Sequence, residues 1–79
     1  MFTIPNPDEF LLELAERRAT LVGKRVRLDY TNDPHTKLVR GDEGIVRRVD
    51  VYGTVHIAWD NGSTLGLIED AGDSFTIIG

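Results

Sequence analysis

The 79-residue sequence contains no cysteine, which excludes disulfide bonds and thiolate metal sites. A domain of this size must therefore be stabilised by apolar packing or by oligomerisation. The sequence also lacks an apolar run of about 20 residues, the length that a membrane-spanning helix requires. Its N-terminal segment MFTIPNPDEF has neither the basic start nor the apolar core of a signal peptide. We therefore expect a single cytoplasmic domain over residues 1–79 with no membrane contact.

Basic residues are absent from both ends of the chain. All nine Lys and Arg residues lie within residues 17–48, and the net charge of the whole chain is −4. Segments of opposite charge can mark an interaction surface, or they can pair across neighbouring strands of a folded sheet. The sequence leaves both interpretations open. The acidic net charge nevertheless disfavours nucleic-acid binding, because it repels phosphate at long range.

Catalytic and metal-binding patterns are also lacking. The two histidines, His35 and His56, have no cysteine with which to form a zinc site. The segment DAGD at residues 70–73 lacks the ligand spacing and the final glutamate of a calcium loop. Neither Ser63 nor Ser74 has a strained nucleophile turn beside it. We therefore expect no enzyme activity, no catalytic residues, no metal and no cofactor.

The N-terminal part of the sequence predicts one helix over residues 6–22. Asn6 can cap its first turn, Pro7 suits the first helical position and Gly23 can end it. An apolar side of this helix would dock on a sheet, or on a second copy of the helix to form a homodimer. The residues on this side are Phe10, Leu11, Leu14, Ala15 and Leu21.

After the helix the apolar period changes to two, which predicts short strands over residues 24–78. The clearest strand is TVHIAW, in which Val55, Ile57 and Trp59 share the inward side. This alternation predicts that Trp59 is a core anchor. It also places His56 on the outward side, where it is either solvated or part of a binding surface.

Two irregularities indicate how these strands bend and turn. Val46 and Val49 are out of phase with each other, which predicts a bulge in their strand. Asn61-Gly62 predicts a tight hairpin because both residues accept positive φ, and Asp60 before them is expected to accept backbone hydrogen bonds in the turn. Five such short strands, separated by turns rich in Gly and Asp, predict a small and strongly curled barrel.

Positions between residues 23 and 78 form a specific combination of turn, aromatic and apolar residues. They are Val26-Arg27-Leu28, Thr31, Asp33-Pro34, Thr36, Leu38, Gly41, Gly44, Val46, Gly53-Thr54-Val55-His56, Trp59-Asp60-Asn61-Gly62-Ser63, Leu65, Leu67 and Phe75. With this combination the chain resembles the small bacterial, plasmid and phage proteins catalogued as domain of unknown function 4314. More distantly it is similar to SH3-like barrels of the Mib/Herc2 and KOW types.

The resemblance implies a fold more than an activity. It implies a mainly β chain, with a five-stranded SH3-like barrel preceded by one amphipathic helix. The distant relatives bind peptides or RNA and catalyse nothing. By analogy the chain is a small protein-binding module, and an accessory protein of a phage or mobile element that acts on a host factor.

The segment 31–43 is the first candidate for a binding surface, since a loop of this length in a compact domain is usually functional. It lies where SH3-like barrels carry a peptide-binding loop. Together with nearby aromatic and polar residues it predicts a surface for a protein or peptide partner, with Trp59 and Asn61 at its edge. The residues of this surface are Tyr30, Thr31, His35, Thr36, Lys37, Arg40, Tyr52 and His56.

Two alternatives remain open at this point. Basic residues on the first two strands, next to aromatic side chains, could bind nucleic acid as other small barrels do. These residues are Lys24, Arg25, Arg27, Arg47 and Arg48. The other alternative is a structural protein that self-assembles through its N-terminal helix.

Overall fold

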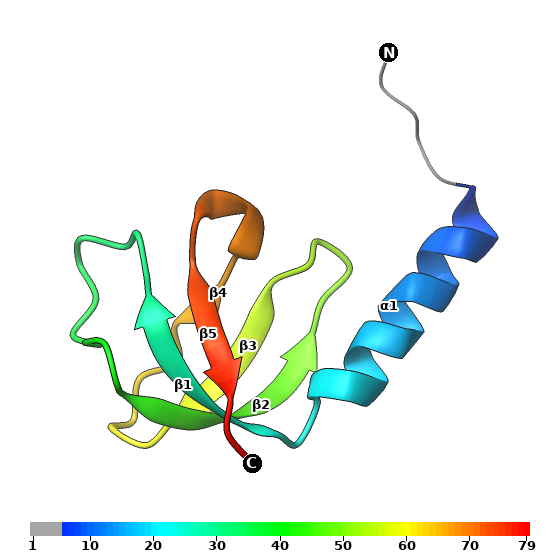
Figure 1. The fold of residues 1–79 in the computed structure, drawn as a ribbon. Coiled ribbons are helices and arrows are strands. Elements are labelled where there is room, and N and C mark those ends of the chain that lie inside the picture. Colours follow the sequence, from blue (N-terminus) through cyan, green and yellow to red (C-terminus); the bar gives the residue numbers. More distant parts are fainter. Residues whose placement is uncertain (1–5) are drawn as a thin grey trace.

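One helix precedes a five-stranded antiparallel sheet in the computed structural model, which describes residues 6–79 (Figure 1). Residues 1–5 of the expected domain lie outside the described part. The elements are α1 Pro7–Leu21, β1 Arg25–Tyr30, β2 Glu43–Val49, β3 Val55–Trp59, β4 Gly66–Leu67, the 3₁₀ turn η1 Glu69–Ala71 and β5 Ser74–Ile77. The strand order is β4-β3-β2-β1-β5. The prediction of a mainly β fold with an N-terminal helix is therefore confirmed. Over the described residues, no helix combines the length and apolar character that a bilayer crossing requires.

The β3 strand alternates between buried and half-buried residues as its sequence predicts. Val55, Ile57 and Trp59 are buried, while His56 and Ala58 between them are half-buried. The inward side chains of β3 join those of β1 and β2 in one apolar core. Leu14 and Leu21 of α1, Leu38 of the β1–β2 loop and Leu67 of β4 complete this core, which holds the sheet together.

A bulge in β2 returns the second half of this strand to the core. The pairing of β2 with β3 shifts between Val46 and Arg48, which leaves Arg47 as the extra residue. Val46 and Val49 are both 1% exposed, although they lie three positions apart, an odd spacing that would place them on opposite faces of a regular strand. The out-of-phase valines therefore predicted the bulge correctly, and the bulge adds local twist to the sheet.

Gly44 lets β2 and β3 approach closely next to Trp59. A Cβ atom at this position would lie 2.6 Å from the carbonyl oxygen of Ala58 and 2.8 Å from the Cα atom of Trp59. Such distances are too short for any side chain, so glycine is required where the two strands cross over the core.

The helix has the expected ends but not the expected buried side. Asn6 caps it by accepting a 2.8 Å hydrogen bond from the backbone N–H of Glu9. Of the expected apolar side only Leu14 and Leu21 are buried, whereas Phe10, Leu11 and Ala15 are exposed.

Docking of this side on a second copy of the helix stays a prediction. Within the chain, only the C-terminal part of α1 reaches the sheet. There the Arg18 Nε–H donates to the carbonyl oxygen of Val49 at 2.9 Å. The Gly23 N–H donates to the carbonyl oxygen of Val46 at 2.8 Å. The N-terminal turns extend away from the strands (Figure 1).

The hairpin after β3 differs in detail from the expected two-residue turn. Among residues 6–79, positive φ occurs only at glycines, so Asn61 does not adopt it, while Gly62 has a φ of +89°. The Gly62 N–H donates to the Trp59 carbonyl at 2.9 Å, and the Trp59 N–H donates to the Ser63 carbonyl at 3.2 Å. The loop thus contains three residues and ends at a left-handed glycine. The following strand, β4, is short and contains only Gly66 and Leu67.

The burial of Trp59 predicts a large loss of stability on truncation. We expect Trp59→Ala to lower the free energy of unfolding by about 3–5 kcal/mol, because a 4%-exposed indole leaves a cavity when it is removed. Urea denaturation followed by far-UV circular dichroism measures this change. Tyr52→Ala is the matched control, since Tyr52 is 87% exposed and its loss should cost less than about 0.5 kcal/mol. Equal effects of the two substitutions would contradict the core role of Trp59.

Candidate functional site

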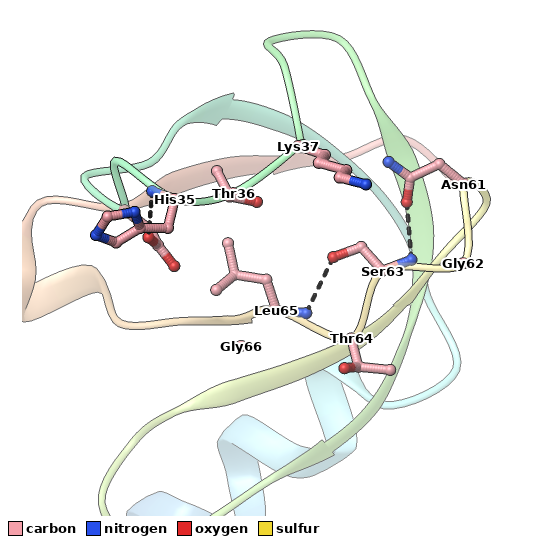
Figure 2. A pocket seen from close by; sticks show the side chains of 10 residues that line it. His35, Thr36, Lys37, Asn61, Gly62, Ser63, Thr64, Leu65 and Gly66 are labelled. Carbon is pink, nitrogen blue, oxygen red and sulfur yellow. Dashed lines mark hydrogen bonds between the residues drawn. The ribbon is translucent and has the colours of Figure 1, made fainter.

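A surface groove of about 660 Å³ lies between the β1–β2 loop and the segment that follows β3. Figure 2 shows its two walls, with His35, Thr36 and Lys37 on one side and the chain from Asn61 to Gly66 on the other. Its lining residues are Asp33, His35, Thr36, Lys37, Asn61, Gly62, Ser63, Thr64, Leu65 and Gly66. The groove is open to solvent, and most of the side chains that line it are polar.

The first wall, residues 33–37, is shaped by hydrogen bonds from backbone N–H groups to side chains two residues earlier in the chain. Thr31 Oγ1 accepts from the N–H of Asp33 at 3.4 Å, and Asp33 Oδ1 accepts from the N–H of His35 at 2.8 Å. Thr36 Oγ1 accepts from the N–H of Leu38 at 3.1 Å. Asp and Thr are the residues that form such turns. The loop therefore has a defined path without strand or helix pairing.

Contacts at two points attach this loop to the rest of the fold. Leu38 is 5% exposed and belongs to the apolar core. Near the start of the loop, Asp73 Oδ1 accepts from the N–H of Asn32 at 2.9 Å, while Asp73 Oδ2 accepts from the N–H of Ile68 at 2.8 Å. Burial raises the pKa of the Asp73 carboxyl, but these donors and the Thr31 hydroxyl more than offset it and leave the pKa lowered. The ionised carboxylate thus joins the loop to the segment before β5.

The second wall is attached to the core by Trp59. Its indole Nε1–H donates to the carbonyl oxygen of Leu65 at 2.9 Å, across the loop that follows β3. Within this loop Asn61 Oδ1 accepts from the N–H of Ser63 at 2.9 Å, and Ser63 Oγ accepts from the N–H of Leu65 at 3.3 Å. The Leu65 side chain is half-buried and packs against the core. Trp59 is therefore buried below the groove wall rather than exposed as a platform.

The structure brings together only part of the predicted partner surface. His35, Thr36 and Lys37 line the groove with Asn61, which was expected at the edge of the surface. The other predicted partner residues do not line it; they are Tyr30, Thr31, Arg40, Tyr52 and His56.

The two tyrosines of the predicted surface lie in different places. Tyr30 donates its hydroxyl to Asn32 Oδ1 at 3.0 Å, at the end of β1. Tyr52 belongs to the β2–β3 turn, where it lines a shallow depression with Phe10 and Leu14 of the helix. Because this depression shares no residue with the groove, the predicted surface is not one continuous site.

His56 is not simply solvated, as the alternation allowed, but belongs to a hydrogen-bond network. Its Nε2 lies 2.9 Å from Asp50 Oδ2, and both side chains are less than one third exposed. The other oxygen, Asp50 Oδ1, accepts from the N–H groups of Tyr52 and Thr54, each at 3.0 Å. The hydrogen bond from His56 and these two backbone donors lower the pKa of the Asp50 carboxyl, against the opposing effect of desolvation. This network stabilises the β2–β3 turn.

Two of the five basic residues of the nucleic-acid alternative, Arg25 and Arg27, lie next to carboxylates. Arg25 Nη1 lies 2.8 Å from Asp60 Oδ2 and 3.6 Å from Glu43 Oε1. The hydrogen bond and the charge of Asp60 raise the pKa of Arg25. Arg27 Nε lies 3.6 Å from Asp29 Oδ1. The remaining basic residues of this set are exposed; they are Lys24, Arg47 and Arg48.

Asp60 therefore has a different role from the one expected. Its carboxylate pairs with Arg25 across the sheet, and Asn61 instead accepts the backbone hydrogen bond in the turn. Within residues 6–79, no group of three or more His, Asp or Glu residues is arranged to hold a metal ion.

Sequence reasoning missed the second wall of the groove, residues 62–66. A signal for it was available. In an antiparallel sheet the loops after the first and third strands leave from the same end, so the segments 31–42 and 60–65 had to be neighbours. The prediction placed Trp59 and Asn61 at the edge of the partner surface, but it did not include the segment that follows them.

The Asp50 network predicts a dependence of stability on pH. A carboxyl whose pKa is lowered on folding stabilises the protein above its ordinary value of 3.8, and this stabilisation is lost as the pH falls through the lower, folded value. We expect the free energy of unfolding to fall less steeply below about pH 4 in Asp50→Asn than in the wild type.

Thermal unfolding between pH 3 and pH 7 measures this difference. Asp70→Asn is the matched control, because Asp70 is exposed and lies outside the network. An identical pH profile for Asp50→Asn and the wild type would show that the network does not couple to folding.

Comparison with known proteins identifies the family of the chain. Residues 11–78 match the family described as "Domain of unknown function (DUF4314)". The match extends further than the expected segment 23–78 and includes most of α1. No curated protein and no solved structure matches the chain. Since the family match covers most of the sequence, the chain belongs to the DUF4314 family.

Proposed function

We propose that this protein is a non-enzymatic protein-binding module and that the groove between residues 33–37 and 61–66 is its binding surface. The observation that supports the proposal is the groove itself, with a volume of about 660 Å³ and two walls that are both held in place. A hydrogen bond from the buried Trp59 holds one wall, and the buried Leu38 together with hydrogen bonds to Asp73 holds the other. Walls that are ordered before binding lower the entropic cost of capturing a flexible peptide.

The shape of the groove favours an extended peptide over a small molecule. Small-molecule sites usually enclose most of the ligand among apolar side chains. Here Leu65 is the one large apolar residue among the described lining residues, and the others are short, polar or charged. A peptide can use such a surface because its backbone supplies hydrogen-bonding groups along its whole length.

The contacts of the groove side chains give no support to catalysis. Nucleophilic catalysis needs a base within hydrogen-bond reach of the nucleophile. In the described part of the chain no hydrogen bond joins Ser63 to His35, and the Ser63 hydroxyl instead accepts from the N–H of Leu65. Both side chains therefore suit binding rather than reaction.

The assignment to SH3-like barrels is part of the same proposal. It is supported by the five short antiparallel strands, the bulge in β2 and the long loop after β1. In SH3-like barrels this loop flanks the peptide site, as the segment 31–42 flanks the groove. We further propose an accessory role in a phage or mobile element, directed at a host factor, on the family resemblance alone.

Protein binding has more support than the two alternatives. Arg25 and Arg27 have carboxylate partners, so the basic side of the sheet offers less free positive charge to phosphates than its sequence suggests. Self-assembly through α1 has support only from exposed apolar residues such as Leu11 and Leu12 on its free end.

Site-specific photo-crosslinking tests the proposed surface. A photoreactive amino acid in place of Thr64, an exposed lining residue, should give discrete protein adducts in a lysate of the source cells. The same amino acid in place of Arg47, which is exposed on the bulge of β2, is the control and also reports on the basic side. We expect adducts from position 64 and not from position 47. Absent adducts at position 64, or the same adducts at both positions, would contradict the proposal.

A further inference from the structure

The polar groups of the groove are not equally free to bind a ligand. Four lining side chains already use an oxygen as acceptor for a backbone N–H within their own wall. These are Asp33 Oδ1 with the N–H of His35, Thr36 Oγ1 with the N–H of Leu38, Asn61 Oδ1 with the N–H of Ser63, and Ser63 Oγ with the N–H of Leu65. The groups that remain for a ligand are therefore mainly hydrogen-bond donors.

The donors follow from the chemistry of each side chain. The hydroxyls of Thr36 and Ser63 each keep a hydrogen that can rotate toward the groove. Because the oxygen of Asn61 is held by the N–H of Ser63, its NH₂ group must be the free end of the amide. Lys37 adds three further donors and a positive charge.

The donors of Lys37 and Asn61 gather at one end of the groove. Figure 2 shows the Lys37 side chain extending toward Asn61, whose amide nitrogen faces back toward it. Figure 2 shows His35 at the opposite end of the groove from Asn61. The carboxylate of Asp33 lies at that opposite end, since its Oδ1 accepts from the N–H of His35 at 2.8 Å. One end of the groove thus presents hydrogen-bond donors and a positive charge. A negatively charged group that accepts hydrogen bonds would match this end.

We propose that the groove binds a peptide segment that carries a carboxylate, and that this carboxylate lies between Lys37 and Asn61. The inference rests on the proposed function, and it adds the chemical class of the ligand. The hydroxyls of Thr36 and Ser63 donate to the peptide's carbonyl groups, while an apolar neighbour of the acidic residue packs on Leu65.

A carboxylate fits this end of the groove better than a phosphate. Lys37 supplies a single charge there, which matches the single charge of a carboxylate. A phosphate group carries close to two negative charges at neutral pH. In a chain with a net charge of −4, the second charge would lack a partner and would be repelled.

Randomised decapeptides, selected on the immobilised full-length protein, test the inference. One library has amidated C-termini, so that a carboxylate can come only from Asp or Glu side chains. A second library has free C-termini, and selection of neutral sequences from it alone would identify the terminal carboxylate as the source. Selected peptides are then titrated onto ¹⁵N-labelled protein, and we expect shifts in the amide signals of residues 33–37 and 61–66.

Three variants of the exposed lysines then isolate the charge. We expect Lys37→Gln to weaken the binding of a selected peptide about tenfold, and Lys37→Arg to retain it, as for the loss of one charge-assisted hydrogen bond. Lys24→Gln makes the same change of charge outside the groove and should leave the affinity unchanged. Raising NaCl from about 50 to about 500 mM should weaken binding to the wild type more than to Lys37→Gln.

The possible failures separate the inference from the function on which it rests. Selected peptides that shift the groove amides but carry no enrichment in Asp, Glu or a free C-terminus would overturn the carboxylate and leave the binding site intact. Unchanged affinity in Lys37→Gln would do the same. If no selected peptide shifts any groove amide, both the inference and the proposed function are wrong.

Discussion

The groove depends on one hydrogen bond, from the indole N–H of Trp59 to the carbonyl oxygen of Leu65. Trp59 is buried with Val55 and Ile57, so its ring position is fixed by the packing of the sheet. Its N–H is the polar end of an otherwise apolar side chain, and a buried indole usually finds a partner for it. By donating to Leu65 it fixes the loop after β3 at a defined distance from the core. The Trp59 side chain therefore contributes both to the stability of the fold and to the geometry of the groove.

The two walls of the groove are attached to the core by different chemistry. Trp59 holds the second wall, while the first wall is held by the apolar Leu38 and by the carboxylate of Asp73. Between these anchors, the hydroxyl oxygens of Thr36 and Ser63 accept hydrogen bonds from backbone N–H groups. The hydrogens of these hydroxyls therefore remain free to donate. A chain of this length cannot enclose a ligand in its small core. It can order two short segments next to each other, and this is the arrangement that recognition of a peptide needs.

The sequence was sufficient to predict those parts of the fold that depend on local order. The alternation around Trp59, the phase slip between Val46 and Val49 and the cap at Asn6 were all confirmed. Each depends on neighbouring residues, for which periodicity and turn chemistry give direct information.

Features that depend on residues far apart in the chain were not predictable in the same way. Arg25 and Asp60 are separated by 35 positions. Their ion pair leaves less unpaired positive charge on the sheet than the composition alone suggests. The burial of Leu14 but not Leu11 depends on where the sheet ends beneath the helix. The groove needed two separate loops to be placed together, which strand direction could have indicated and local patterns could not.

Hydrogen exchange in Trp59→Phe tests the central claim most directly, because phenylalanine keeps an apolar ring and lacks the N–H. We predict that the amides of Gly62, Ser63 and Leu65 exchange about tenfold faster than in the wild type, as the loss of one hydrogen bond implies. The amides of Val26 and Leu28, in the centre of β1, should change much less. Wild-type exchange rates after β3, or the same acceleration in β1 as after β3, would contradict the claim that this bond holds the groove wall.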